Sequence, residues 1–180
     1  MRGSQARQGV PGQEGSGTMS YLWRKGLVVA ALTAAALLVA APGSATTPSA
    51  FTGSFQNISS VTTGFRQADG NTFISQTVQV IYAGELSGPV VEHIDVVIHP
   101  DGNFNFKGED DCTCTLAGTG LSGTIALPFA GSGDASGSAS GHFTIGDGTG
   151  GLASMHGVGT FDSSNGGSSG PFSGVYHFDP

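Results

Sequence analysis

Residues Leu121–Ala130 read LSGTIALPFA, and apolar and polar side chains alternate along them. Every second residue of this stretch falls on one apolar face, which holds Leu121, Ile125, Leu127 and Phe129. The opposite face holds Ser122, Thr124, Ala126 and Pro128. A period of two residues is typical of a β-strand with one buried face. The stretch therefore predicts a strand packed against a core.

The same period returns along the rest of the chain from about Thr46, and no stretch shows helical spacing of its apolar residues. Gly88-Pro89 and Pro100–Asn103 are predicted to separate strands. The predicted strands are Phe51–Ile58, Thr72–Leu86, Val90–Ile98, the segment with Phe104 and Phe106, Leu121–Ala130, Gly137–Ile145, Val158–Phe161 and Phe172–Asp179. About eight antiparallel strands favour an all-β domain that closes into a small barrel, with a β-sandwich as the alternative.

The N-terminal part of the chain predicts export. Gly26–Ala41 is an uncharged apolar run that follows Arg24 and Lys25 and precedes Pro42-Gly43. This is the layout of a signal peptide, and the run is shorter than the roughly 20 apolar residues of a membrane-spanning helix. We expect a disordered leader or overcalled start at 1–18, a signal peptide at 19–45 and one domain at 46–180. The mature protein is then secreted or extracytoplasmic and meets the membrane only transiently.

The predicted mature chain is strongly acidic. After Ala45 only Arg66 and Lys107 are basic, against twelve Asp and Glu residues, which gives a formal charge of −10. Such a charge repels phosphate backbones and anionic lipids, so nucleic-acid partners are not expected. Nothing in the sequence calls for a cofactor.

Cys112 and Cys114 are the two cysteines of the chain. In a strand, residues two apart face the same way, and an oxidising exterior favours a disulfide between them. Free thiols or one half of a metal site are the alternatives, although a lone Cys-x-Cys lacks the second half of a zinc site.

Glycine and aromatic spacing in the C-terminal half carries a family resemblance. The motifs are GTGLSGT at 118–124, HFTI at 142–145, GTGGL at 148–152, GVGTF at 157–161 and VYHF at 175–178. Their order resembles uncharacterised bacterial proteins with an allene-oxide-cyclase-like, or dirigent-like, barrel. The resemblance implies an eight-stranded barrel and supplies no catalytic residue. The Cys112–Cys114 segment and the Ser-rich loop at 163–169 depart from the family pattern.

Glu92 is the candidate with the most specific chemistry. Its position in the strand groups it with Val90 and Ile94 on the inward face, where a carboxyl group loses water and its pKa rises. It is thus a weak candidate for a general acid, whereas a position at the barrel mouth would leave it solvated. Gln76, Tyr82 and Tyr176 also fall on inward faces, as pocket residues or as core packing.

Other motifs carry less chemistry. Four of the five histidines, namely His93, His99, His142 and His177, fall on outward faces, so no metal site is predicted. The match to G-x-G-x-x-G at 146–151 lacks the strand–turn–helix context of a dinucleotide site. Asp110 and Asp111 are interpreted as an acidic turn in solvent rather than a weak calcium site.

Three functions remain as hypotheses. The first is a barrel that binds an apolar or amphipathic small molecule inside, and an interior filled by phenylalanines would exclude it. The second is an isomerase or cyclase of the allene-oxide-cyclase kind, which requires Glu92 in an enclosed cavity. The third is a structural or interaction protein of the cell exterior, which requires an exposed apolar patch or an oligomer interface. Binding is favoured over catalysis.

Overall fold

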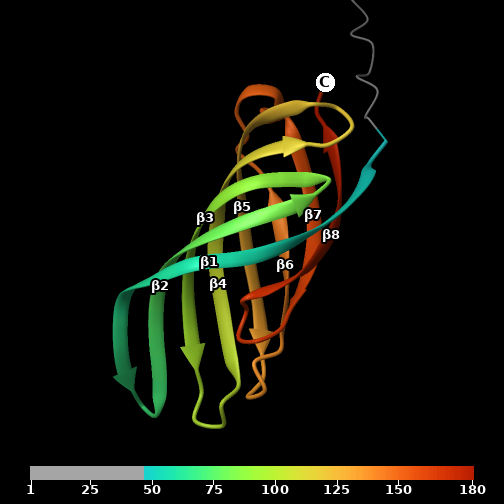
Figure 1. Cartoon of the computed structure of the whole chain (residues 1–180). Coiled ribbons are helices and arrows are strands. Elements are labelled where there is room, and N and C mark those ends of the chain that lie inside the picture. Colours follow the sequence, from blue (N-terminus) through green and yellow to red (C-terminus); the bar gives the residue numbers. More distant parts are fainter. Residues whose placement is uncertain (1–46) are drawn as a thin grey trace, which may run out of the picture. The chain divides into compact units, whose positions relative to one another are not determined.

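The computed structural model describes residues 47–180, and these form a closed antiparallel barrel of eight strands. Each strand pairs with the next, and β8 returns to β1 (Figure 1). This confirms the predicted closed barrel over the β-sandwich. The predicted leader and signal peptide, together with Thr46, lie outside the described residues.

The strands are long and their connections are short. They are β1 (Ser49–Ala68), β2 (Asn71–Gly84), β3 (Leu86–Ile98), β4 (Phe104–Leu116), β5 (Leu121–Gly133), β6 (Ala139–Ile145), β7 (Met155–Ser163) and β8 (Ser169–Phe178). One 3₁₀ turn, η1 (Gly150–Leu152), lies between β6 and β7. Within residues 47–180, no helix is long and apolar enough to cross a membrane.

Alternating burial follows the alternating sequence. On β5, Ile125, Leu127 and Phe129 are buried, as predicted. Leu121 starts the strand at the rim of the barrel and is 38% exposed. On β4, every second residue from Phe106 to Leu116 is buried, apart from the small Gly108, which is partly exposed. Period-two patterning thus specifies which side chains enter the barrel.

β1 extends well beyond the predicted Phe51–Ile58 strand. It pairs with β2 as far as Ala68 but with β8 only as far as Gln56. Register shifts occur between Asn57 and Ser59 and between Thr62 and Gly64. A bulge inserts one residue and reverses which side chains face inward. The interrupted alternation explains why the sequence predicted a shorter strand.

The boundary between β2 and β3 differs from the prediction. The strands separate at Glu85, and Gly88-Pro89 lies inside β3. The turn is tied to β1, because the backbone N–H of Thr52 donates to the Glu85 carboxylate at 2.7 Å. Gly84 has a φ of +125°, which side-chain-bearing residues rarely adopt. A contact distant in sequence therefore sets this turn.

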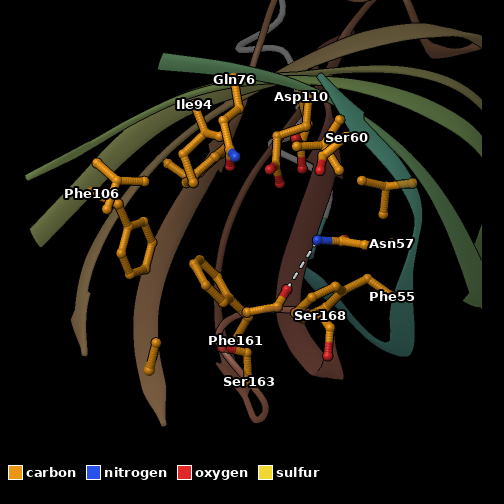
Figure 2. A pocket seen from close by; sticks show the side chains of 18 of the residues that line it. Phe55, Asn57, Ser60, Gln76, Ile94, Phe106, Asp110, Phe161, Ser163 and Ser168 are labelled. Carbon is orange, nitrogen blue, oxygen red and sulfur yellow. Dashed lines mark hydrogen bonds between the residues drawn. The ribbon is translucent and has the colours of Figure 1, made fainter. Parts of the chain in front are cut away.

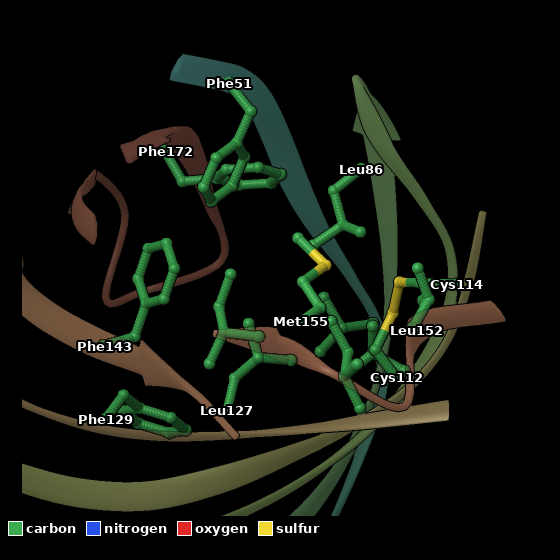
Figure 3. Close-up of a cluster of buried hydrophobic side chains, with 14 of the residues drawn as sticks. Phe51, Leu86, Cys112, Cys114, Leu127, Phe129, Phe143, Leu152, Met155 and Phe172 are labelled. Carbon is green, nitrogen blue, oxygen red and sulfur yellow. A yellow bond between two sulfur atoms is a disulfide. The ribbon is translucent and has the colours of Figure 1, made fainter. Parts of the chain in front are cut away.

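The end of the barrel nearest η1 is filled by side chains, and we call it the closed end. Leu86, Leu152 and Met155 are fully buried there. Figure 3 shows them gathered with the Cys112–Cys114 disulfide. Close packing of this kind excludes water from the closed end. The interior is therefore hollow only toward the opposite end.

Candidate functional site: an internal cavity with an acidic floor

A cavity of about 600 Å³ occupies the other half of the barrel. Most of its wall is apolar, as Figure 2 shows for Ile94, Phe106 and Phe161. Ile58 lines the cavity and is 61% exposed, so the cavity reaches the surface beside β1, and we call this opening the mouth. Its size and lining are typical of small-molecule sites.

The phenylalanines predicted to face inward form walls and do not fill the interior. Phe55, Phe104, Phe106, Phe129 and Phe143 all line the cavity. Contacts between rings hold several of these side chains in place; the Phe106 and Phe129 centroids, for example, lie 6.2 Å apart. An interior filled by phenylalanines would have excluded a binding cavity, and the structure does not have such an interior.

Three ionisable side chains form the floor of the cavity, and we call them the acidic floor: Tyr82, Glu92 and Asp110. Along the inward face of β4, Phe104 and Phe106 come first, then Gly108 and Asp110, and then the fully buried Cys112. Asp110 therefore lies where the cavity meets the packed closed end. Glu92 is its direct partner on β3.

Tyr82 reaches this pair from β2. Its hydroxyl group donates a hydrogen bond to Oδ2 of Asp110, two strands away. The Tyr82 ring is held by Phe172, whose centroid lies 5.0 Å away.

Burial dominates the ionisation of the acidic floor. Loss of water, and after it the neighbouring Asp110, raises the pKa of Glu92 from 4.5 to about 8. Burial also raises the pKa of Asp110 to about 7, against the opposing effect of the Tyr82 hydrogen bond. The pKa of Tyr82 is likewise raised, first by burial and then by Asp110. Glu92 is therefore mostly protonated at neutral pH, and Asp110 is about half protonated.

Two buried acceptor atoms in the cavity have no hydrogen-bond partner. They are Oδ1 of Asp110 and Oδ1 of Asn57. The amide nitrogen of Asn57 donates to the Gly167 carbonyl at 3.2 Å (Figure 2), whereas its Oδ1 accepts no hydrogen bond. An unpaired buried acceptor carries a free-energy cost that a bound donor would remove.

The structure brings together three of the four predicted pocket residues. Gln76, Tyr82 and Glu92 line the cavity. Tyr176 lies outside the lining and packs against Phe51, with ring centroids 6.0 Å apart. For Tyr176, the alternative of core packing describes its position.

Asp110 and Asn57 were missed as site residues. The interpretation of Asp110 and Asp111 as a solvated turn is wrong for Asp110, which is 6% exposed and lies in the middle of β4. Counting by twos from Phe104 and Phe106 would have placed Asp110 inward. No comparable signal marks Asn57, because it sits beside the first bulge of β1.

Cys112 and Cys114 form a disulfide at the closed end, with Cα atoms 5.3 Å apart. Both residues are 1% exposed. The disulfide borders the acidic floor through Asp110, two residues before Cys112. It supports the floor without reaching the cavity lining.

The histidines lie away from the cavity. His156 and His177 are cross-strand partners, and both contact the Asp179 carboxylate, at 3.2 and 3.3 Å. Among the described residues, no group of three His, Cys, Asp or Glu side chains has the arrangement of a metal site.

The fold and the site together define an eight-stranded antiparallel β-barrel with a partly hollow, acid-floored interior. Among solved structures, the chain is similar to a protein of unknown function from the DUF3224 family of Shewanella oneidensis MR-1. The TM-score is 0.59 at 16% sequence identity, over 74% of this chain and 100% of that chain. At this identity the likeness shows the fold alone. No family model matches the sequence, and no curated protein matches it.

Proposed function

We propose that the protein is exported and that its barrel binds an apolar or amphipathic small molecule in the cavity. The observation that carries this proposal is the cavity itself: about 600 Å³, walled by aromatic and aliphatic side chains and accessible beside Ile58. Burial of an apolar ligand against these walls supplies the driving force for binding.

Three features support export. The N-terminal segment has the layout of a signal peptide, the sequence after it is acidic, and the two cysteines pair as disulfides do in oxidising compartments. The resemblance to allene-oxide-cyclase-like barrels agrees with a role that uses the interior. That resemblance rests on glycine and aromatic spacing and is an analogy of fold.

Binding of Nile red, a neutral dye that fluoresces in apolar surroundings, tests the binding proposal. The wild-type protein should bind the dye, and Ile94→Trp should weaken binding by narrowing the cavity. Ile81→Trp is the matched control, because Ile81 is 43% exposed on the outer face of β2. Equal dye binding by both variants would place the dye on the surface and contradict the proposal.

A second candidate is proton-transfer catalysis of the isomerase or cyclase kind. It is favoured by Glu92, which lines the cavity and has a pKa of about 8, near the range useful to a general acid or base. Turnover of an apolar epoxide or enone substrate that is lost in Glu92→Gln, while that variant still binds the substrate, would support catalysis. Binding without turnover in the wild-type protein would support a carrier.

A further inference from the structure

All the ionisable groups that line the cavity are acids. The ionisable residues in its lining are Tyr82, Glu92 and Asp110, and within the described residues no Lys, Arg or His lines it. Each of these three groups is either neutral or negative. The cavity therefore opposes a carboxylate or phosphate ligand and accepts a neutral or cationic one.

The unpaired hydrogen-bonding atoms of the cavity also favour a cationic ligand. The unpartnered polar atoms, Oδ1 of Asp110 and Oδ1 of Asn57, are both oxygen acceptors. The hydroxyl of Tyr82 is already used as a donor to the other oxygen of Asp110. When Asp110 is ionised, its Oδ1 and the Oδ1 of Asn57 are both acceptors without a donor, and an ammonium group offers three donors.

The order of side chains along β3 gives the ligand a direction. From the mouth toward the closed end, the inward residues are Ile98, Val96, Ile94 and then Glu92. Beyond Glu92, Val90 is fully buried. An amphipathic ligand would thus contact apolar walls along its length and meet acids only at its inner end.

We infer that the cavity binds an amphipathic amine, with its protonated head group against Glu92 and Asp110 at the acidic floor and its apolar chain directed toward Ile58 at the mouth. This inference rests on the proposed function, because it names the ligand class of the same cavity. An ammonium group at the floor donates to the unpaired Oδ1 of Asp110 and offsets one of the two negative charges that Glu92 and Asp110 carry when both are ionised. A fatty acid of the same length would instead place a third negative charge beside them.

Competition against Nile red in the purified full-length protein tests the inference, with decylamine, decanol and decanoate as matched probes. At about pH 9 the amine stays protonated and both carboxyl groups are ionised. Decylamine should displace the dye at a concentration about tenfold or more below that of decanol, and decanoate should be the weakest. Lowering the pH to about 6 should reduce the preference for the amine, since Glu92 and Asp110 take up protons.

Variants test whether the preference for the amine depends on the acidic floor or on the overall negative charge of the protein. Glu92→Gln and Asp110→Asn should each reduce the preference for decylamine over decanol, while Glu109→Gln, on the exposed face of β4, should retain it. If one floor variant fails to fold, the other carries the test.

Three results would overturn the inference. Equal displacement by decylamine and decanol, or stronger displacement by decanoate, would overturn the inference and leave the binding proposal intact. Absence of binding by Nile red and by every probe would overturn both.

Discussion

Glu92 and Asp110 lie directly opposite each other on β3 and β4, and both side chains line the cavity. Like charges at facing positions in a sheet are destabilising, and burial increases the penalty. The pair therefore retains at least one proton near neutral pH, and this property affects both the stability of the protein and the chemistry of the cavity.

The stability of the protein should fall as the pH rises from about 5 to about 8. Unfolded Glu and Asp ionise near 4.5 and 3.8, whereas the folded pair keeps its protons to about 8 and 7. The folded state then binds more protons than the unfolded state in this window, so its free energy of unfolding decreases with pH and levels off above it. Urea unfolding at a series of pH values measures this slope.

Glu92→Gln should remove most of the contribution that Glu92 makes to the pH dependence of stability. Relative to the wild type, the free energy of unfolding of the variant should increase by ~2 kcal/mol between the two ends of this window, less than the full pKa shift implies because Glu92 is partly exposed. Glu109→Gln is the control with the same chemical change on an exposed face. A wild-type stability that rises with pH over this window would contradict the buried acid pair.

Tyr82→Phe should raise the pKa of Asp110 above about 7. The Tyr82 hydrogen bond favours the ionised carboxylate and so opposes the effect of burial. The variant should also lose about 1 kcal/mol of stability, because a buried hydrogen bond is removed. Carboxyl-carbon NMR titration reports the pKa directly. Tyr176→Phe, outside the cavity, should leave the Asp110 titration unchanged; an unchanged Asp110 pKa in Tyr82→Phe would refute the contact.

The protein purified under non-reducing conditions should contain no free thiol. Cys112 and Cys114 pair in the packed closed end, where both are shielded from solvent. Alkylation in denaturant followed by mass spectrometry should modify neither cysteine before reduction and both after it. Alkylation of both cysteines before reduction would show that the thiols are free. The link spans only two residues, so its loss should cost less stability than that of a disulfide closing a long loop.

Gly123→Ala should destabilise the closed end. A Cβ at Gly123 would overlap the carbonyl oxygen of Thr149, which precedes η1. Overpacking of this kind costs about 1–3 kcal/mol. Gly146→Ala is the matched control, because no atom lies near the position of its added Cβ. Equal unfolding midpoints for the two variants in urea would show that η1 does not pack tightly against β5.

Much of the fold follows from period-two patterning, and the failures have local causes. The strand count and the inward positions of Gln76, Tyr82 and Glu92 follow from alternation. Alternation alone also fits a β-sandwich, and the closed barrel was favoured by the strand count and implied by the family resemblance. The far half of β1 was missed because bulges interrupt its alternation. The β2–β3 turn was misplaced because it depends on the contact between Glu85 and Thr52.

The acidic floor could be predicted only in part. Glu92 was found from its neighbours on one strand, but its partner Asp110 lies in a run of three acids that suggests a solvated turn. The pairing of Glu92 with Asp110, and the reach of Tyr82 across β3, depend on strand register. A one-residue slip would reverse both faces, and a single sequence does not specify register to that precision.

The central claim is that the barrel is hollow between its mouth and a buried acid pair. The interior electron density in a crystal structure of the purified protein tests this claim most directly. We expect an open or ligand-occupied space of about 600 Å³, with Glu92 and Asp110 facing each other at its floor. An interior filled by the side chains of Phe55, Phe106 and Phe161, with Glu92 turned into solvent, would contradict the cavity and both proposals built on it.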